Sequence, residues 1–520
     1  MGSITYLFAI AVAAYLFFDQ RSRARKARRF PPGPKPLPFL GNALQFPASD
    51  PGEKFAEWEK EFGDVVGLTL YGQKVIVVNT YTAAAELLEK RSSIYSNRPQ
   101  RALFAKYGGW DFAISATNPG ELFNLERRFL NQFFNTSAVK RYFNLITKNA
   151  RRYISLTAND PTRFRDWNRI TTAANILSVA YGHEVADEND EWVERTEQAM
   201  KSFGVLGPPG THPIDIFPSQ VGYLPFRIWG LKFSEGMKIV QKCAHEMSIV
   251  PYKLVKDQVL AGTAVPSLSS TLIENNLLPD KSVKNEKAIY GSAAVVYMAG
   301  ADTTVSSIDS FLLAMLLYPD IQKKAQRYVD GLLQGERLPT LEDRDSLPYI
   351  QAIVKETLRW QPIVPLGLPH SLSQDDTYRD YFLPADTMVI YNLRRLLRDP
   401  TEYPEPDQFK PERFIDSDAG QLKLRTDVRD PEDMAFGFGK RICPGRHFAN
   451  ATLWITFATL LTVFDISLAK NEAGEPILPD LQYVNGTVSH PKHFQCVFRA
   501  RSEHALSLLQ STSDLFDALE

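Results

Sequence analysis

Ten residues near the end of the chain carry the strongest chemical signal in the sequence, Phe436-Gly-Phe-Gly-Lys-Arg-Ile-Cys-Pro-Gly445. Their three glycines free the backbone for turns and for close approach to a flat ligand. Cys443 precedes Pro444, a good first residue for the helix that the pattern predicts over 447–464. A thiol at the positive end of a helix is expected to have a lowered pKa, which favours the thiolate as nucleophile or metal ligand. A single cysteine is more often a small buried hydrophobe, but this spacing argues for chemistry.

A second group of reactive side chains interrupts a long apolar helix. The pattern predicts one helix from Lys287 to Tyr318, ended by Pro319. Its first half is apolar around the whole circumference, as in a helix that is buried on all sides. Asp302 and Thr303 then introduce a carboxylate and a hydroxyl, which are groups that hold and transfer protons. This polar break also argues against a second membrane span, because charge is expensive inside a bilayer.

Helical patterns dominate the elements that must position these residues. A hairpin is predicted over Val65–Asn79, with its turn at Tyr71-Gly72-Gln73. Further helices are predicted over Tyr81–Lys90, Glu121–Phe134, Val139–Leu156, Trp192–Phe203, Gly236–Gln258 and Ile350–Trp360. Because we find no repeat, low-complexity tract or second linker, one large and mostly helical unit over residues 48–520 is the simplest organisation.

The first residues are predicted to attach the chain to a membrane. Ile4–Phe18 carries no charge, and residues 1–18 as a helix would span about 27 Å, close to the thinner bilayer of the endoplasmic reticulum. Basic residues follow between positions 21 and 29, which predicts a luminal N-terminus and a cytosolic body. We therefore expect a single-span transmembrane anchor over residues 1–20, with a segment lying in the interface as the alternative. The basic and proline-rich stretch 21–47 is expected to form a stiff hinge.

Composition excludes several classes of protein. Of 520 residues, 44% are hydrophobic and 23% are charged, so the chain is neither disordered nor fibrous. The 59 Lys and Arg nearly balance the 60 Asp and Glu, so no nucleic-acid partner is expected. The three cysteines are odd in number and far apart, which excludes a disulfide framework and fits a reducing compartment.

The cysteine loop resembles that of the haem-thiolate monooxygenases of the cytochrome P450 family, Phe-x-x-Gly-x-Arg-x-Cys-x-Gly, at every fixed position. The resemblance implies a fold that is mainly α with small β-sheets, in which a large helical domain has a long central helix over the haem and a minor β domain accompanies it. It implies that Cys443 is the axial ligand of the iron in haem b (iron protoporphyrin IX), where a thiolate favours O–O cleavage. It also implies that Phe436 packs near this ligand and that Arg441 pairs with a haem propionate.

The sequence at the polar break also resembles a motif of this family. Ala299-Gly-Ala-Asp-Thr303 matches the pattern of the helix that passes over the distal side of the haem. The resemblance implies that Gly300 leaves room for dioxygen, that the Thr303 hydroxyl holds a water, and that Asp302 supplies protons from outside. The alternative is that Thr303 bonds back to a carbonyl and that Asp302 sits in a buried salt bridge.

Two further motifs are predicted to stabilise the haem-binding core. Glu356-Thr-Leu-Arg359 and the later Pro411-Glu-Arg-Phe414 match family motifs in family order. Glu356 and Arg359 share a helix face at spacing i, i+3, and Arg413 can complete a carboxylate–guanidinium cluster. The expected role is structural.

Two weaker matches concern the propionates. Phe123-Asn-Leu-Glu-Arg127 lies where the family has Trp-x-x-x-Arg, so Arg127 is expected to pair with a propionate while Phe123 replaces the tryptophan. His370 lies where family members often have a basic propionate partner, although a lone histidine is more often structural. The segment Asn392–Pro400 departs from the family at Arg394, Arg395 and Leu397, which could perturb packing or partner docking without affecting catalytic residues.

The favoured interpretation is a monooxygenase in the endoplasmic reticulum membrane whose catalytic domain faces the cytosol. It uses O2 and electrons from NADPH, delivered by a separate NADPH–cytochrome reductase with cytochrome b5 as an optional donor, because the chain lacks a flavin domain and a Gly-x-Gly-x-x-Gly fingerprint. We expect a monomer. The alternatives are a reductase-independent haem-thiolate isomerase or dehydratase that acts on a peroxide, and a non-catalytic haem-binding protein.

The expected substrate is a small apolar molecule, a terpenoid, polyketide or alkaloid of fungal secondary metabolism. The stretch Pro365–Asp386 and the ending Ser489-His-Pro491 look most like fungal members that oxidise such compounds. The segments predicted to line the pocket are mostly apolar: Lys106–Phe112, Phe203–Leu206, Val295–Ala299, Ile363–Leu368 and Gly486–Val488.

Overall fold

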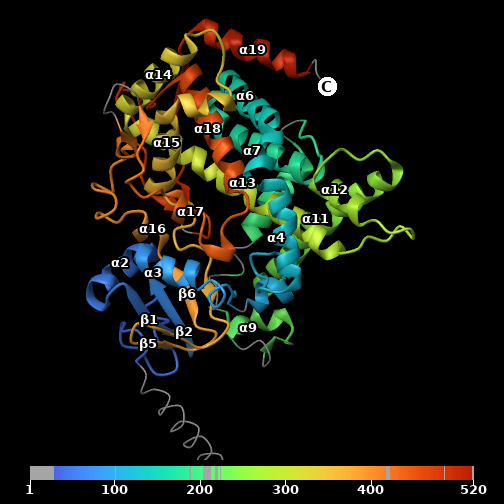
Figure 1. Cartoon of the computed structure of the whole chain (residues 1–520), viewed down its shortest axis with the longest axis vertical. Helices are drawn as coiled ribbons and strands as arrows, with labels where there is room; N and C mark the ends of the chain where they lie inside the picture. Colours follow the sequence, from blue (N-terminus) through green and yellow to red (C-terminus); the bar gives the residue numbers. More distant parts are fainter. Residues whose placement is uncertain are drawn as a thin grey trace, which may run out of the picture.

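The computed structural model is mainly helical with several small sheets. It describes residues 29–47, 49–99, 101–186, 189–202, 206, 212–216, 221–222, 224–416, 422–484 and 486–517. The predicted anchor over residues 1–20 lies outside the described residues, as does the predicted hinge up to residue 28. In Figure 1 the main sheet and α2 lie together at the lower left, and the helices form the larger part above and to the right.

The described part of the chain contains helices of very different lengths. The α-helices are α2 (Pro51–Phe62), α3 (Tyr81–Ala84), α4 (Glu121–Phe134), α5 (Thr136–Val139), α6 (Phe143–Asn159), α7 (Phe164–Tyr181), α8 (Glu191–Ser202), α9 (Pro213–Ile216), α11 (Leu231–Ala261), α12 (Leu268–Asn276), α13 (Glu286–Leu317), α14 (Pro319–Leu333), α15 (Pro348–Trp360), α16 (Leu393–Leu396), α17 (Glu432–Ala435), α18 (Arg446–Val463) and α19 (Glu503–Asp517). Two π-helices, η1 (Ala85–Lys90) and η2 (Leu103–Tyr107), and the 3₁₀ turns η3 (Lys140–Tyr142), η4 (Pro161–Arg163), η6 (Phe226–Trp229), η7 (Leu341–Ser346), η8 (Pro411–Phe414) and η9 (Gly439–Arg441) connect them.

The largest sheet has four strands in the order β1-β2-β6-β3. The hairpin of β1 (Val65–Leu70) and β2 (Gln73–Val78) is antiparallel and turns at Tyr71-Gly72, as the sequence predicts. β6 (Met388–Tyr391) runs parallel to β2, and β3 (His370–Ser371) pairs antiparallel with β6. The remaining strands form two-stranded ribbons: β4 (Asp376–Tyr378) with β5 (Tyr381–Leu383), β7 (Ile415–Asp416) with β8 (Lys423–Leu424), β9 (Phe464–Ser467) with β12 (Val497–Ala500), and β10 (Tyr483–Val484) with β11 (His490–Pro491).

The central helix α13 organises the core. It packs along α7, α4, α11 and α18, and most of its side chains before the polar break are buried. Phe311 of α13 stacks on Phe457 of α18 with ring centroids 3.8 Å apart. The predicted end of α13 before Pro319 is confirmed, because proline cannot continue the hydrogen-bond ladder of the preceding turn.

Most predicted helices are present within a few residues of their predicted ends, and the predicted helix over 121–134 coincides with α4. The largest omission is α7, whose sequence carries polar residues on faces that turn out to be buried. Asn168 donates to the Val305 carbonyl and to the Asp309 carboxylate of α13, and Asn175 accepts from Asn149 of α6. Because these polar groups are satisfied by partners, α7 can be buried without an apolar stripe.

Within the residues that the structure describes, no single helix combines the length and the apolar character needed to cross a bilayer. The pair α13 and α14 meets those criteria together, by length and composition only, with a bend of 106° between the two helices.

Candidate active site

The cysteine loop is closed by its own backbone. The Cys443 amide donates to the Phe436 carbonyl at 2.8 Å, and α18 begins at Arg446. Gly439 has a φ of 53° and lies against η1, where a Cβ atom would come within 2.5 Å of the Leu88 carbonyl oxygen. Only glycine combines this left-handed backbone with so close an approach. The loop is therefore held between η1 and the start of α18. Cys443 lies half-buried near the C-terminal end of the loop.

The expected lowering of the Cys443 pKa is wrong for the protein alone. Burial raises the pKa of the thiol, and this outweighs the hydrogen bonds from the Gly445 and Arg446 amides and the positive charges of Arg127 and Arg446, which lower it. The helix end is present as predicted, but desolvation disfavours the charged sulfur more strongly than the helix end favours it. A bound metal ion removes this obstacle, because a coordinating thiol is deprotonated outright.

Arg441, two residues before the cysteine, is held by three backbone carbonyls. Its guanidinium donates to Ser96 at 2.8 Å, to Ile114 at 2.9 Å and to Thr117 at 2.6 Å. It also lies 4.2 Å from the ring centroid of Phe123, the residue that replaces the family tryptophan. Phe123 thus keeps an aromatic surface for the cation but offers no indole N–H.

Two more arginines join Arg441 to form a group that we call the buried arginine cluster, in which Arg98 is buried and Arg127 and Arg441 are partly buried. Arg127 of α4 donates to the Ile442 carbonyl at 2.8 Å, directly before the cysteine. Arg98 donates to the carbonyls of Leu368 and Pro369 at 2.6 and 2.7 Å.

The electrostatics of the cluster are unfavourable for its cations. Burial lowers the pKa of all three arginines, to about 10 for Arg98 and to about 9 for Arg441, and the charges of Arg98 and Arg127 lower that of Arg441 further. Within the described residues, none of the three forms an ion pair with a carboxylate, and the buried Nε of Arg98 has no hydrogen-bond partner. Buried cations are normally paired with anions. This cluster therefore suits a ligand with carboxylate groups, and the two propionates of a haem fit that requirement.

His370 lies beside this cluster on β3. It is buried, and its Nδ1 donates to the Tyr95 carbonyl at 2.7 Å. Burial first, and then the charges of Arg98 and Arg441, hold the pKa of His370 well below its usual range. A neutral histidine whose Nδ1–H is used in this way has only an acceptor at Nε2. A role as propionate partner therefore requires His370 to gain a proton when the carboxylate arrives.

The polar break of α13 shows the back-bond of the alternative interpretation but not its buried salt bridge. The Thr303 hydroxyl donates to the Ala299 carbonyl at 2.9 Å, and Asp302 lies 3.1 Å from Nε2 of His490. The Asp302–His490 contact is not buried, since about a quarter of each side chain is exposed (25% and 26%). Back-bonding leaves the lone pairs of the Thr303 oxygen available, so the hydroxyl can still hold a water.

The expectation for Gly300 needs correction. A Cβ atom at this position would come within 2.5 Å of Cδ1 of Ile176 on α7. The glycine therefore allows α13 and α7 to pack closely, and its missing side chain points at the neighbouring helix.

The predicted carboxylate–guanidinium cluster is confirmed. Glu356 accepts from Arg359 at 2.7 and 2.9 Å and from Arg413 at 3.1 and 3.2 Å, with the Lys410 amide as a further donor at 2.6 Å. Both arginines also donate to backbone carbonyls, among them that of Leu397. The three charged side chains are buried, and this cluster is complete within the chain.

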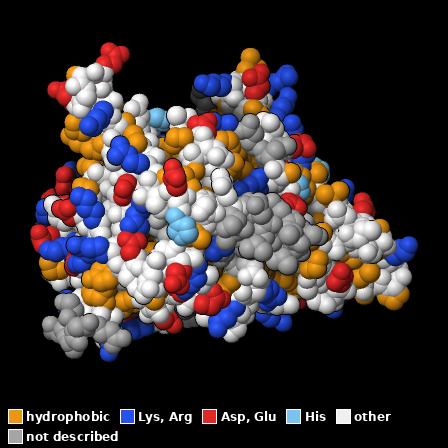
Figure 2. All heavy atoms as spheres, turned by 90° about the horizontal axis from the view of Figure 1, so that it is seen from above, with side chains coloured by type: hydrophobic (Ala, Val, Ile, Leu, Met, Phe, Trp, Pro, Cys, Tyr) orange, Lys and Arg blue, Asp and Glu red, His pale blue; other side chains and the backbone are white. Residues whose placement is uncertain are grey.

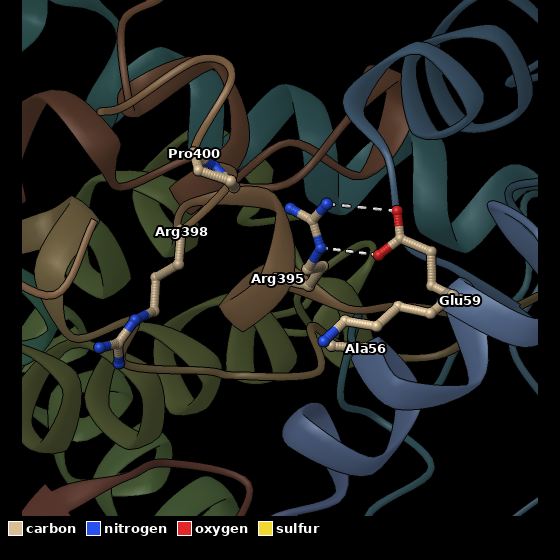
Figure 3. Close-up of a pocket in the computed structure, with 6 residues that line it drawn as sticks. Ala56, Glu59, Arg395, Arg398 and Pro400 are labelled. Atoms are coloured by element: carbon tan, nitrogen blue, oxygen red, sulfur yellow. Dashed lines mark hydrogen bonds and ion pairs between the residues drawn. The ribbon is translucent and has the colours of Figure 1, made fainter. Parts of the chain in front are cut away.

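Arg394 and Arg395, two of the residues that depart from the family pattern, bind α16 to α2. Arg394 donates to Glu53 at 2.8 Å, and Arg395 donates to Glu59 at 2.6 Å. Figure 3 shows Arg395 directed at Glu59, at an open pocket of about 430 Å³, while Arg398 points away from this pair. Burial raises the pKa of Glu59 despite the charge of Arg395. Leu397 is fully buried, so its side chain serves packing.

The predicted pocket segments are brought together in part. The Ser489 amide, at the end of the predicted segment Gly486–Val488, donates to the Ile363 carbonyl at 2.8 Å. In the segment Lys106–Phe112, Phe112 is buried and contacts Tyr290 of α13 edge to face. Residues 203–205 lie outside the described residues.

Sequence reasoning missed Arg98, Glu126 and His490. Arg98 precedes Pro99, which holds it extended, but a single arginine in a loop gives no further signal. Glu126 is fully buried on α4, and neither carboxylate oxygen has a hydrogen-bond partner among the described residues; burial raises its pKa to about 8, against the charges of Lys287 and Arg441. Its position beside Arg127 was visible in the sequence, but its burial was not.

Comparison with known proteins identifies the family. The model of the family described as Cytochrome P450 matches residues 31–498. Cytochrome P450 monooxygenases 208 and 105 of Postia placenta are 36% and 37% identical to this chain; the matches cover 96% and 99% of it and 96% of each relative. Tryptamine 4-monooxygenase of Psilocybe cyanescens is 36% identical over 97% of this chain and 99% of its own length.

A cysteine loop, a buried arginine cluster and a long central helix define the site of a haem-thiolate enzyme. The chain belongs to the cytochrome P450 family and is a monooxygenase of that family.

Proposed function

We propose that this protein is a membrane-anchored monooxygenase that inserts one oxygen atom of O2 into an apolar small molecule, with electrons from NADPH delivered by a separate reductase. The observation that carries the proposal is the buried arginine cluster beside the cysteine loop. Among the described residues, these three cations donate to carbonyls and pair with no carboxylate, so a cofactor with two carboxylates would complete them.

The family implies haem iron, and the residues described above fit haem b. Cys443 would hold the iron, Phe436 would pack beside the sulfur, and Arg98, Arg127 and Arg441 would bind the propionates. When bound, a thiolate-ligated haem supplies the activation of dioxygen. The chain itself supplies a hydroxyl at Thr303 that can hold a water, and a partly exposed carboxylate at Asp302 that can exchange protons with solvent.

The proposed substrate is a small apolar molecule of fungal secondary metabolism. Support comes from the mostly apolar composition of the predicted pocket segments and from relatives in fungi, one of which is named as a tryptamine 4-monooxygenase. Hydroxylation is the expected outcome, and the identity of the scaffold is left to product analysis.

The proposed location is the endoplasmic reticulum membrane, with the catalytic part in the cytosol. Support comes from the apolar run over residues 4–18 followed by basic residues. The described part of the predicted hinge also carries exposed apolar side chains: Phe39 is 97% exposed and Leu44 is 73% exposed. Such side chains suit a surface that lies close to lipid.

The test is expression of the full chain in yeast microsomes, with Cys443→Ala and the matched control Cys243→Ala, which removes a buried thiol far from the loop in sequence. Wild type and Cys243→Ala should show the thiolate absorption band of the reduced, CO-bound haem and should consume NADPH only when a fungal reductase is present. Cys443→Ala should lose both signals.

A thiolate band that persists in Cys443→Ala would overturn the ligand assignment. Turnover of a peroxide without NADPH or reductase would instead show the isomerase or dehydratase alternative. Candidate terpenoid, polyketide and alkaloid scaffolds are fed to the same cells, and oxidised products are identified by mass spectrometry.

A further inference from the structure

The polar residues in the second half of α13 share one face of the helix. Asp302, Ser306, Asp309 and Ser310 are spaced i, i+4, i+7 and i+8, a spacing that places side chains on one side of an α-helix. Ser306, Asp309 and Ser310 are buried, so they require partners in the interior.

Apart from Asn168 of α7, which also donates to Asp309, those partners belong to the β10–β11 hairpin or to a residue that binds it. Ser306 donates to the Ser489 carbonyl, and the Tyr483 hydroxyl donates to Ser310 at 3.0 Å. Arg165 of α7 donates to Asp309 at 2.9 Å and to the Pro491 carbonyl at 2.8 Å. The hairpin is therefore held on α13 by contacts on both sides of His490.

His490 lies between these two fixed points and faces Asp302. Its Nε2 is 3.1 Å from Oδ1 of the carboxylate. Asp309 is buried, whereas about a quarter of the Asp302 side chain is exposed, so Asp302 is the acidic member of this face that solvent reaches. His490 is therefore the residue through which the hairpin contacts the partly exposed carboxylate of Asp302.

The same hairpin carries a predicted substrate segment. Next to its tip, residues 486–488, the Ser489 amide donates to the carbonyl of Ile363, the first residue of another predicted segment, Ile363–Leu368. One residue, Ser489, thus separates this tip from His490. A displacement of the tip would reach His490 through this one residue, whose amide and carbonyl are both hydrogen-bonded.

We propose that His490 is a positioning residue for Asp302, which couples the substrate-binding hairpin to the proton supply at Thr303. This rests on the proposed monooxygenase function. His490 holds the carboxylate at the solvent edge of α13, where it takes protons from water and passes them toward the Thr303 hydroxyl. Loss of the contact leaves the carboxylate free to turn, and more of the reduced oxygen then leaves as hydrogen peroxide instead of being reduced to water.

The test compares His490→Gln, which keeps an N–H near the Nε2 position, with His490→Phe, which keeps a ring but has no donor. Full-length holoprotein is mixed with a fungal reductase, and hydrogen peroxide formed per NADPH consumed is measured without added substrate. His490→Phe should raise this ratio several-fold, and His490→Gln should stay close to wild type. The matched control is Lys492→Gln, which removes an exposed partner of Asp480 on the same hairpin and should change nothing.

A readout independent of turnover is amide hydrogen exchange over residues 299–304 and 482–491. His490→Phe should speed exchange in both segments, and His490→Gln should not. The double variant Asp302→Asn/His490→Phe should give no more peroxide than Asp302→Asn alone, because residues that act through one another are not additive.

A wild-type peroxide ratio in His490→Phe, or an effect of the same size in the Asp302→Asn background, would overturn the proposal. So would equal peroxide ratios in His490→Gln and His490→Phe when both retain the thiolate band, because a merely structural role would give that result. Failure of the proposed function is distinguishable: the wild type itself would then lack the thiolate band and NADPH consumption, while the exchange measurements would still report on the contact.

Discussion

In the described part of the chain, two groups of arginines are buried or partly buried, and their charges are compensated in different ways. Arg359 and Arg413 share the Glu356 carboxylate, so their charges are balanced inside the chain. The three members of the buried arginine cluster, Arg98, Arg127 and Arg441, have backbone carbonyls as hydrogen-bond acceptors, and burial lowers the pKa of each.

The difference separates a scaffold from a binding site. When a buried ion cluster contains charges of both signs, the attraction between them is gained on folding, and no ligand is required to balance the charge. Cations that carbonyls orient but no carboxylate neutralises retain a strong preference for an anionic ligand. Among the described charged groups, Glu126 is the carboxylate that raises the pKa of Arg441, and it forms no hydrogen bond that would neutralise the cluster. Three experiments test this contrast.

Removal of the shared carboxylate should have the largest effect. Glu356→Gln leaves two buried guanidinium groups without an anion, so we expect the free energy of unfolding to fall by about 3–5 kcal/mol. Denaturant unfolding of the holoprotein, followed by tryptophan fluorescence, measures the change. The matched control is Glu53→Gln, which removes an exposed partner of Arg394 and should cost less than about 1 kcal/mol. Similar losses in both variants would contradict the claim that the internal cluster is the scaffold.

The pH dependence of stability should reveal Glu126 as a carboxylate without a partner. Burial raises its pKa from the ordinary 4.5 to about 8, so between these values the folded protein binds a proton that the unfolded chain releases. This contribution to stability is fully present below pH 4.5 and is lost as the pH rises through 8.

Between about pH 5 and about pH 8, wild type should therefore lose roughly 2–4 kcal/mol relative to Glu126→Gln. Parallel denaturant titrations at both pH values measure the difference. Glu121→Gln, an exposed position on the same helix, serves as control and should follow the wild type. Equal pH slopes for wild type and Glu126→Gln would show that Glu126 has a partner in solution.

Loss of one unpaired cation should lower the affinity for haem more than it lowers the free energy of unfolding. Arg98→Met removes a charged donor for a propionate, and hydrogen bonds to charged groups are worth about 1.5–3 kcal/mol. We expect haem transfer to excess apomyoglobin to become about tenfold to a hundredfold faster. Arg395→Met, which removes a surface arginine paired with Glu59, should leave haem release unchanged. Unchanged release in Arg98→Met would remove Arg98 from the propionate site.

Local pattern predicted the elements well wherever side-chain chemistry and burial agreed. α4 follows Gly120 and ends at Phe134, directly before Asn135, whose side chain caps the next helix, and its predicted range matches the structure. α7 was missed because Asn168 and Asn175 are buried by partners on α13 and α6, and those partners are distant in sequence. Periodicity detects apolar faces, so a helix buried through hydrogen bonds gives no such signal.

The sequence by itself determined the chemistry of short segments: the cysteine loop with its glycines, the i, i+3 pair of Glu356 and Arg359, and the end of the central helix before proline. These depend on backbone freedom and spacing, which are local properties. Tertiary structure alone decided that Arg98, Arg127 and Arg441 meet, since Arg441 is bound by the carbonyl of a residue 345 positions away. The folded chain also raises the pKa of Cys443, where the sequence predicted a lowered one, and it packs Gly300 against Ile176 of α7. Desolvation and close packing depend on neighbours that only the folded chain supplies.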